Sequence, residues 1–162
     1  MTSKPLIKPA LPIHRQKILS VLADTHVFNE EELIVSAQLL DCFLQEGEAG
    51  GYIADVSLED GAPTGYVCFG QTPLTRGTWD IYWLAVDPAK QRKGIGKELL
   101  LFAEEVIREK GGYLSLIETS TRDDYAGARR LYEAIGYKVD CVIPDFYAPG
   151  DGRYLFSKRL DR

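Results

Sequence analysis

Two glycines and three basic residues lie close together where an apolar strand is followed by an amphipathic helix. Gly94 and Gly96 carry no side chains, so backbone N–H groups can point into the turn, and the helix that begins there adds the positive end of its dipole. Arg92, Lys93 and Lys97 place mobile positive charge at the same point. This combination predicts a binding site for the phosphates of a cofactor.

Two common phosphate-binding motifs do not match this turn. The dinucleotide-binding motif needs a small residue three positions after the second glycine, where this chain has Leu99. The P-loop needs a glycine five residues before its Gly-Lys pair and a hydroxyl residue after it, and these positions hold Gln91 and Glu98. The sequence therefore excludes both a Rossmann dinucleotide site and a nucleoside-triphosphatase P-loop.

The remaining pattern is Gln-x-x-Gly-x-Gly after a strand that ends Leu-Ala-Val-Asp-Pro, and it resembles the acetyl-CoA signature of the GNAT N-acetyltransferase superfamily. A second segment, at residues 128–137, resembles the superfamily's Ala-x-x-Leu-Tyr-x-x-x-Gly-Phe pattern, with Tyr137 in place of Phe. The two segments have the expected order and spacing. With the neighbouring strands, the resemblance covers residues 64–160.

The resemblance implies how acetyl-CoA would bind. The strand ending at Val86 and the strand beginning at Tyr113 would separate, with the pantetheine arm between them. Many members carry Asn three positions before the alanine of the second segment, where this chain has Tyr125. Tyr125 would therefore make the cofactor contact with its hydroxyl or ring, a surface tyrosine being the alternative. The backbone of Leu84, Ala85 and Val86 would pair with the pantetheine, and the pyrophosphate would lie on Gln91, Arg92, Lys93, Gly94, Ile95, Gly96 and Lys97.

Transfer of an acetyl group to an amine needs a base, donors for the tetrahedral oxyanion and an acid for the leaving thiolate. Tyr132 occupies the tyrosine of the Leu-Tyr pair and is the candidate acid, since phenol and thiol pKa values are close. Tyr132 also lies on the apolar stripe of its helix, so a core position is the alternative. Asp80 and Glu118 are the base candidates. The alternative for each is an ordinary polar residue at the edge of a strand. The resemblance places the oxyanion donor near Leu84 or Ala85.

The acceptor site is expected from Trp83, Asp145 and Tyr147, because aromatic walls with one carboxylate suit a cationic amine. The resemblance implies transfer of acetyl from acetyl-CoA to a primary amine of a small molecule or amino-acid derivative. A protein lysine or N-terminal acetyltransferase, and a non-catalytic acyl-CoA-binding regulator, remain alternatives. Dimers are common in the superfamily, so a homodimer is one assembly that the resemblance raises. No metal-ligand spacing is present.

Length, charge and composition limit the number of domains and the kinds of partner that the chain can have. The 162 residues fit one domain, 1–162, and the net charge of −5 argues against a nucleic-acid surface. No apolar run reaches signal-peptide or membrane-spanning length. The three widely spaced cysteines are expected as small buried residues in a reducing compartment. These features predict a cytoplasmic protein without a membrane or nucleic-acid partner.

The elements that must position these groups follow from hydrophobic periodicity and turn residues. Asn29, followed by three glutamates, is expected to cap the second of two N-terminal helices. Strands are expected at 52–58, 64–70, 78–86, 113–120, 137–143 and 153–160. Helices are expected after the phosphate turn and again before Gly136. The order predicts an α/β fold with a mixed sheet and helices on both faces. The GNAT resemblance makes this sheet mostly antiparallel, with six to seven strands, about four helices and a splayed strand pair.

Overall fold

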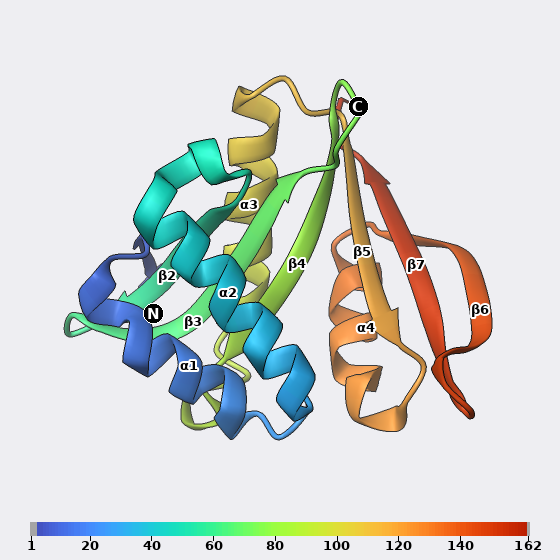
Figure 1. Ribbon diagram of the computed structural model, residues 1–162, viewed down its shortest axis with the longest axis horizontal. Helices are drawn as coiled ribbons and strands as arrows, with labels where there is room; N and C mark the ends of the chain where they lie inside the picture. The colour runs from blue at the N-terminus through green and yellow to red at the C-terminus, as the bar shows by residue number, and fades with distance from the viewer. Residues whose placement is uncertain (1–2, 162) are drawn as a thin grey trace.

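The computed structural model describes residues 3–161. Residues 1–2 and 162, the ends of the expected domain, lie outside the described residues. The regular elements are β1 (Leu6–Pro9), α1 (Arg15–Asp24), α2 (Glu30–Glu46), β2 (Ile53–Glu59), β3 (Ala62–Gln71), β4 (Thr78–Val86), α3 (Ile95–Glu109), β5 (Leu114–Ser120), α4 (Ala126–Ala134), β6 (Lys138–Ala148) and β7 (Asp151–Arg159) (Figure 1). Short 3-10 helices occupy Pro12–His14, Gly47–Gly50, Pro88–Lys90 and Asp123–Tyr125.

The strands form one sheet in the order β1-β2-β3-β4-β5-β7-β6. All neighbouring strands in that order are antiparallel except β4 and β5, which are parallel. A parallel pair needs a crossover connection, and α3 provides it. The expected mixed, mostly antiparallel sheet with four flanking helices is confirmed for the described residues.

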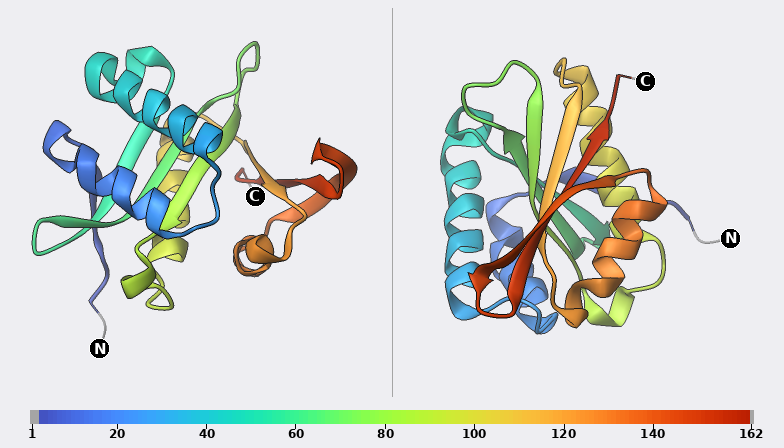
Figure 2. Two further views of the ribbon diagram at one scale, coloured as in Figure 1. Left: turned by 60° about the horizontal axis from the view of Figure 1, so that its bottom comes forward. Right: turned by 90° about the vertical axis from the view of Figure 1, so that its right-hand side faces the viewer.

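The helices form two layers, one on each face of the sheet. In the right panel of Figure 2 the sheet is seen between α1 and α2 on one side and α3 and α4 on the other. The core beneath α3 and α4 includes Leu99, Ile107, Ile117 and Phe156, and the core beneath α1 and α2 includes Leu22. We refer to the two sides as the α3/α4 face and the α1/α2 face.

Local chemistry explains where the helices begin and end. Asn29 Oδ1 accepts from Glu32 N, and Glu32 Oε2 accepts from Asn29 N, both at 2.8 Å, which is a capping box. This confirms Asn29 as the cap of α2. Helix α3 is followed by Gly111 at φ +79°, a left-handed backbone conformation that glycine adopts without strain.

The C-terminal hairpin is longer than the sequence predicts. Strand β6 does not end at Ile143 but continues to Ala148, with an irregular register against β7 between these two residues. Pro144 and Asp145 suggest a strand end, yet an edge strand tolerates proline because its outer N–H groups need no partner. All of β6 is exposed, so Cys141 is exposed as well, whereas Cys68 is buried as expected.

None of the helices in residues 3–161 is both long enough and apolar enough to cross a membrane.

Candidate functional site

Strands β4 and β5 stay paired over only four residues each. Their register runs from Thr78 opposite Leu114 to Ile81 opposite Ile117, and beyond these the strands have no recorded pairing. Figure 1 shows the strands adjacent near the start of β4 and separated near its end. We call the region beyond Ile81 and Ile117 the splay. It leaves one backbone edge of β4 available to a ligand.

A β-bulge lies at the point where the splay begins. Cys68 of β3 is opposite Trp83 and Phe69 is opposite Ile81, so Tyr82 is the extra residue of β4. Ile81 belongs to the core of the α3/α4 face, whereas Tyr82 packs on Tyr52 and Trp83 packs in the core of the α1/α2 face. The bulge therefore turns two consecutive aromatic side chains to the same side.

The backbone direction after the bulge decides which groups face the splay. Asp87 N donates to Thr64 O of the β3 side at 2.9 Å. Backbone groups alternate along a strand, so those of Leu84 and Val86 point away from β3 and into the splay, while those of Ala85 point to β3. Gln91 Nε2 donates to Val86 O at 3.2 Å, which ties the turn to the strand edge.

The turn presents free backbone donors. Arg92 and Gly94 have φ values of +62° and +81°, and Gly94 is the residue before α3. The first recorded helical bond runs from Glu98 N to Gly94 O at 3.0 Å. The amides of the first helical turn, Ile95, Gly96 and Lys97, come before it and have no partner within the helix.

Gly96 marks how closely the elements approach. A Cβ atom there would lie 3.4 Å from Leu131 Cδ2 of α4 and 3.6 Å from Val86 Cγ2 of β4. Gly96 therefore lies within van der Waals reach of both β4 and α4, the elements on the two sides of the splay. The three nearby cations, Arg92, Lys93 and Lys97, are exposed and form no ion pair among the described residues.

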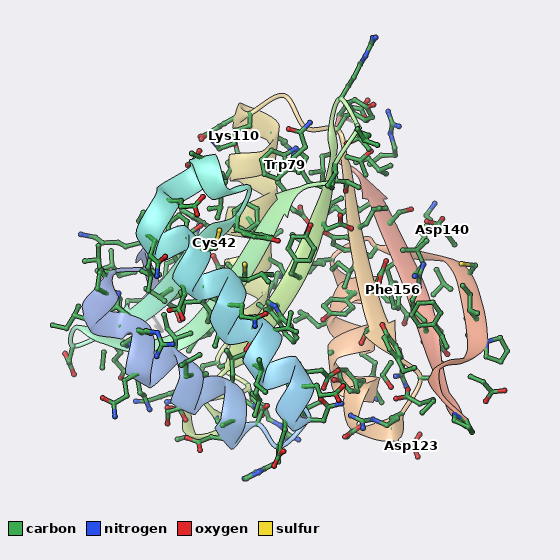
Figure 3. The ribbon with its side chains drawn as sticks, viewed as in Figure 1. Cys42, Trp79, Lys110, Asp123, Asp140 and Phe156 are labelled. Atoms are coloured by element: carbon green, nitrogen blue, oxygen red, sulfur yellow. The ribbon has the colours of Figure 1, made fainter. Side chains whose placement is uncertain are left out.

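Tyr132 lies on the α3/α4 face, where it is buried (7% exposed). Its ring packs edge-on against Phe156 and Tyr137, and no hydrogen bond to its hydroxyl is recorded within residues 3–161. Burial raises the pKa of Tyr132 to about 12. Figure 3 labels Phe156, the residue of β7 against which Tyr132 packs.

The two base candidates lie before and after Ile81 and Ile117, the last residues that pair β4 with β5. Asp80 is still within the paired segment, opposite Leu116, and its Oδ2 accepts from Thr72 Oγ1 at 2.5 Å. Glu118 is the first residue of β5 beyond the pair. Because Ile117 points into the α3/α4 core, Glu118 points to the α1/α2 face.

On the α1/α2 face, the loop between α1 and α2 reaches across the splay. Phe28 packs edge-on against Trp83 of β4 at 5.3 Å and against Tyr125, just before α4, at 6.4 Å. Arg122 Nη2 also donates to Val27 O at 2.8 Å. Tyr125 is thus half-buried against this loop, and Trp83 Nε1 is buried with no hydrogen-bond partner in the described part of the chain.

The β6–β7 hairpin forms the other side of this face. Asp145 has a φ of +55°, and its Oδ1 accepts from Gly150 N at 2.7 Å, so its carboxylate stabilises the hairpin turn. Tyr147 is half-exposed. Burial, then the charge of Glu118, raises the pKa of Tyr147 to about 12, and Glu118 also contributes to the raised pKa of Tyr82. Glu118 therefore lies near tyrosines on both sides of the splay.

Two residues of this region have no signal in the sequence analysis. Phe28 follows an ordinary helix end, and Arg153 is one of several arginines near the C-terminus. Arg153 Nη1 lies 3.4 Å from Glu118 Oε1. Strand alternation and the β5–β7 register bring Arg153 to the α1/α2 face. The local sequence does not predict this register.

The residues of the splay fit acetyl-CoA. The unpaired edge of β4 offers amide groups to a pantetheine arm, and the first-turn amides of α3 with three free cations suit a pyrophosphate. A Cβ at position 96 would lie between β4 and α4, the elements on the two sides of the splay. Among the described residues, no three His, Cys, Asp or Glu side chains are placed to hold a metal ion. Fold and site together define an α/β protein with a splayed sheet and a turn of free amides and cations beside it.

Comparison with known sequences identifies the family within this class. A model of the Acetyltransferase (GNAT) family matches residues 16–137, so the chain belongs to the GNAT acetyltransferase family. It is 32% identical over 96 residues to the S-(2-succino)cysteine N-acetyltransferase of Bacillus subtilis (strain 168). The matched residues make up 59% of this chain and 53% of that protein. The chain spans about half the length of the curated relatives it matches.

Solved structures agree with this family. A protein from Desulfovibrio desulfuricans assigned to the GNAT acetyltransferases has a TM-score of 0.92 and 35% identity, covering 97% of this chain and 99% of that one. The acetyltransferase-like YncA of Salmonella typhimurium, solved with its cofactor acetyl-CoA, has a TM-score of 0.78 at 22% identity, covering 99% and 96%. The second likeness concerns the fold alone.

Proposed function

We propose that the chain is an N-acetyltransferase that transfers acetyl from acetyl-CoA to the primary amine of a small molecule or amino-acid derivative. The observation that carries this proposal is the end of β4–β5 pairing at Ile81 and Ile117, which leaves the edge of β4 unpaired as far as Val86 and the turn of free amides and cations that follows it. When bound, acetyl-CoA supplies an activated thioester. The curated relative that acts on S-(2-succino)cysteine supports an amino-acid derivative as acceptor.

The chain's own groups fall into roles by position. The backbone of Leu84 and Val86 faces the splay and would hold the pantetheine, and the N–H of Leu84, next to the bulge, would donate to the developing oxyanion. The backbone groups of Ala85 point to β3, so Ala85 would not bond the pantetheine and would only hold Leu84 and Val86 in the strand. The turn of residues 91–97 would hold the pyrophosphate. Tyr125, half-buried against Phe28, would close the side of the site.

Glu118 is the base that the geometry favours. It lies at the beginning of the splay on the face opposite α3, and its side chain is 45% exposed, so a proton can leave to solvent. Asp80 is already bonded to Thr72 and lies in the paired segment. Glu118 would hold the acceptor's ammonium and remove its proton, which exposes the lone pair for attack.

Tyr132 would act at the leaving sulfur. With a pKa of about 12, the phenol stays protonated at neutral pH. Full transfer to a thiolate with an ordinary pKa of about 8.5 would be unfavourable by roughly 5 kcal/mol. We therefore assign Tyr132 a hydrogen bond that stabilises the developing charge on sulfur; Tyr132 keeps its proton, and CoA leaves as the thiolate and takes its proton from solvent.

Two measurements test the proposal. Acetyl-CoA at about 100 times its dissociation constant should stabilise the fold by roughly 2.7 kcal/mol, whereas NAD and ATP should add little. Release of the CoA thiol should depend on an added amine, and Glu118→Gln should lose most of this turnover while keeping the acetyl-CoA shift. Asp80→Asn is the matched control and should lose less. Binding of acetyl-CoA without turnover on any amine would instead support a non-catalytic acyl-CoA-binding protein.

A further inference from the structure

Arg153 is a desolvated cation with most of its donors unused. Its side chain is 18% exposed, and its guanidinium lies 4.7 Å from the ring centroid of Phe146. Nε is buried and has no hydrogen-bond partner within residues 3–161. The recorded charge partner is Glu118, whose Oε1 is 3.4 Å from Nη1. That distance is longer than the about 2.8 Å of a good charge-assisted hydrogen bond.

A guanidinium carries five N–H donors in a planar fork that matches a carboxylate. One loose contact to a half-exposed glutamate leaves this capacity largely free. The folded protein already holds the guanidinium largely out of water, because the side chain packs on Phe146. An incoming carboxylate would therefore gain a strong interaction at a small further cost.

The position of this cation relates it to the acetyl transfer. Arg153 is opposite Ser120 in the β5–β7 register, and Glu118 is opposite Leu155, so the two side chains lie diagonally on the α1/α2 face. Glu118 is one residue beyond the last pair of β4 and β5. An amine at Glu118 thus lies beside the bulge of β4, and a group at Arg153 lies one ion-pair distance further toward the open end of the splay.

We infer that the acceptor is an α-amino acid, or an amino-acid derivative, with a free α-carboxylate: Arg153 binds the carboxylate and Glu118 binds the ammonium group. An α-amino acid carries its ammonium and carboxylate groups on the same carbon atom, and this close pair of charges matches the neighbouring Glu118 and Arg153, which are 3.4 Å apart. The inference rests on the proposed function and specifies its substrate class.

The surrounding surface suits the acceptor's side chain. Phe146 and Tyr147 pack edge-on at 5.0 Å and are each about half exposed, and Tyr82 of β4 is 38% exposed. Exposed aromatic rings gain from covering by apolar or aromatic groups. A free peptide or protein N-terminus would present an amide where an amino acid presents its carboxylate, and would leave Arg153 unused.

The test compares matched acceptors. CoA release is measured with saturating acetyl-CoA and a panel of L-amino acids, each beside its α-amide and its decarboxylated amine. Wild type is expected to show a kcat/KM at least about tenfold higher for the free acid, the size of a hydrogen bond to a charged group. Arg153→Gln should lose this preference by lowering kcat/KM for the acid while leaving the amide within about twofold. Arg159→Gln, on the same strand but paired with Asp161, is the control and should keep the preference.

The possible results separate the two proposals. No acetyl-CoA shift, or no CoA release with any amine, would overturn the proposed function and this inference with it. Turnover without a preference for the free acid in wild type would overturn the inference alone. An equal loss of acid and amide turnover in Arg153→Gln would also overturn it, because it would show a structural role. If Arg153→Gln does not fold, Arg153→Lys keeps the charge but not the fork, and a reduced acid preference in that variant supports the inference.

Discussion

Lys158 Nζ of β7 lies 2.9 Å and 2.8 Å from the two carboxylate oxygens of Glu104 on α3. The Glu104 side chain is 1% exposed, and Arg108 Nη2, at 3.6 Å, is its second cation. Helix α3 lies beneath the half of the sheet that contains β4, and β7 belongs to the other half. Lys158 is opposite Ser115, in the segment of β5 that stays paired with β4. The ion pair therefore joins the two halves of the sheet beside the closed end of the splay.

Replacing Lys158 with Met is expected to destabilise the fold by about 3 kcal/mol, because Glu104 would remain buried and Arg108, at 3.6 Å, would be its one recorded cation among the described residues. Adding Glu104→Gln should recover part of that loss, since a neutral amide costs less to bury than a carboxylate. Urea unfolding of both variants measures the difference. A loss below about 1 kcal/mol for Lys158→Met would show that the pair contributes little.

Tyr132→Phe is expected to lower kcat roughly 10- to 100-fold, the value of a hydrogen bond to a developing charge. Acetyl-CoA affinity should not change, because the pantetheine and pyrophosphate groups are assigned to β4 and the turn. Steady-state kinetics and a binding titration separate the two effects. Tyr154→Phe, on the same face and stacked on Phe156, is the control. Unchanged turnover in Tyr132→Phe would leave Tyr132 as a core residue.

Gly96→Ala is expected to weaken acetyl-CoA binding without weakening the fold. The new Cβ would meet Leu131 at 3.4 Å, a contact that a leucine can absorb, and alanine in a helix is favoured over glycine by roughly 0.5–1 kcal/mol. Thermal unfolding should therefore show an unchanged or higher Tm without ligand and a smaller rise with acetyl-CoA. Gly127→Ala, whose Cβ would meet only Arg130 Nη2 at 3.9 Å, should keep the full rise.

Asp55 gives the fold a pH dependence of its own. It is 3% exposed on β2, its Oδ2 has no hydrogen-bond partner in the described part of the chain, and burial, then the charge of Glu48, raises its pKa to about 6. A raised carboxyl pKa means that the folded state binds the proton more tightly. This contribution to stability is fully present below pH about 4 and is lost as the pH rises through about 6.

Asp55→Asn should therefore raise the free energy of unfolding at pH 7.5 by on the order of 2 kcal/mol and have little effect near pH 4. Urea unfolding at the two pH values measures this. Asp41 is the contrasting control, because its hydrogen bond with Arg15 lowers its pKa, so Asp41→Asn should not stabilise the fold at pH 7.5. An equal effect of Asp55→Asn at both pH values would contradict the assignment.

The turn of residues 91–97 could be predicted because its conformation depends on neighbouring residues. Its glycines, its cations and the start of α3 lie within a few residues, and the left-handed conformation of Gly94 is one that glycine spacing alone suggests. The same holds for the Asn29 capping box. The GNAT family, its mixed sheet and the crossover between β4 and β5 also follow from motifs and element order along the chain.

The acceptor side could not be predicted in the same way. Glu118 was one of two equal base candidates until the register of β4 and β5 placed it at the beginning of the splay and Asp80 within the paired segment. Arg153 and Phe28 come to lie beside the splay only through strand order, alternation and a loop that crosses the sheet.

By itself, the sequence determined which local segments gather basic residues, begin a helix or turn the chain, since these depend on neighbouring residues. Only the tertiary structure decided which distant side chains meet. The contacts between Glu118 and Arg153 and between Glu104 and Lys158 depend on the order β5-β7-β6 and on exact registers. A shift of one residue would turn each of these side chains to the other face, and no local pattern specifies that choice.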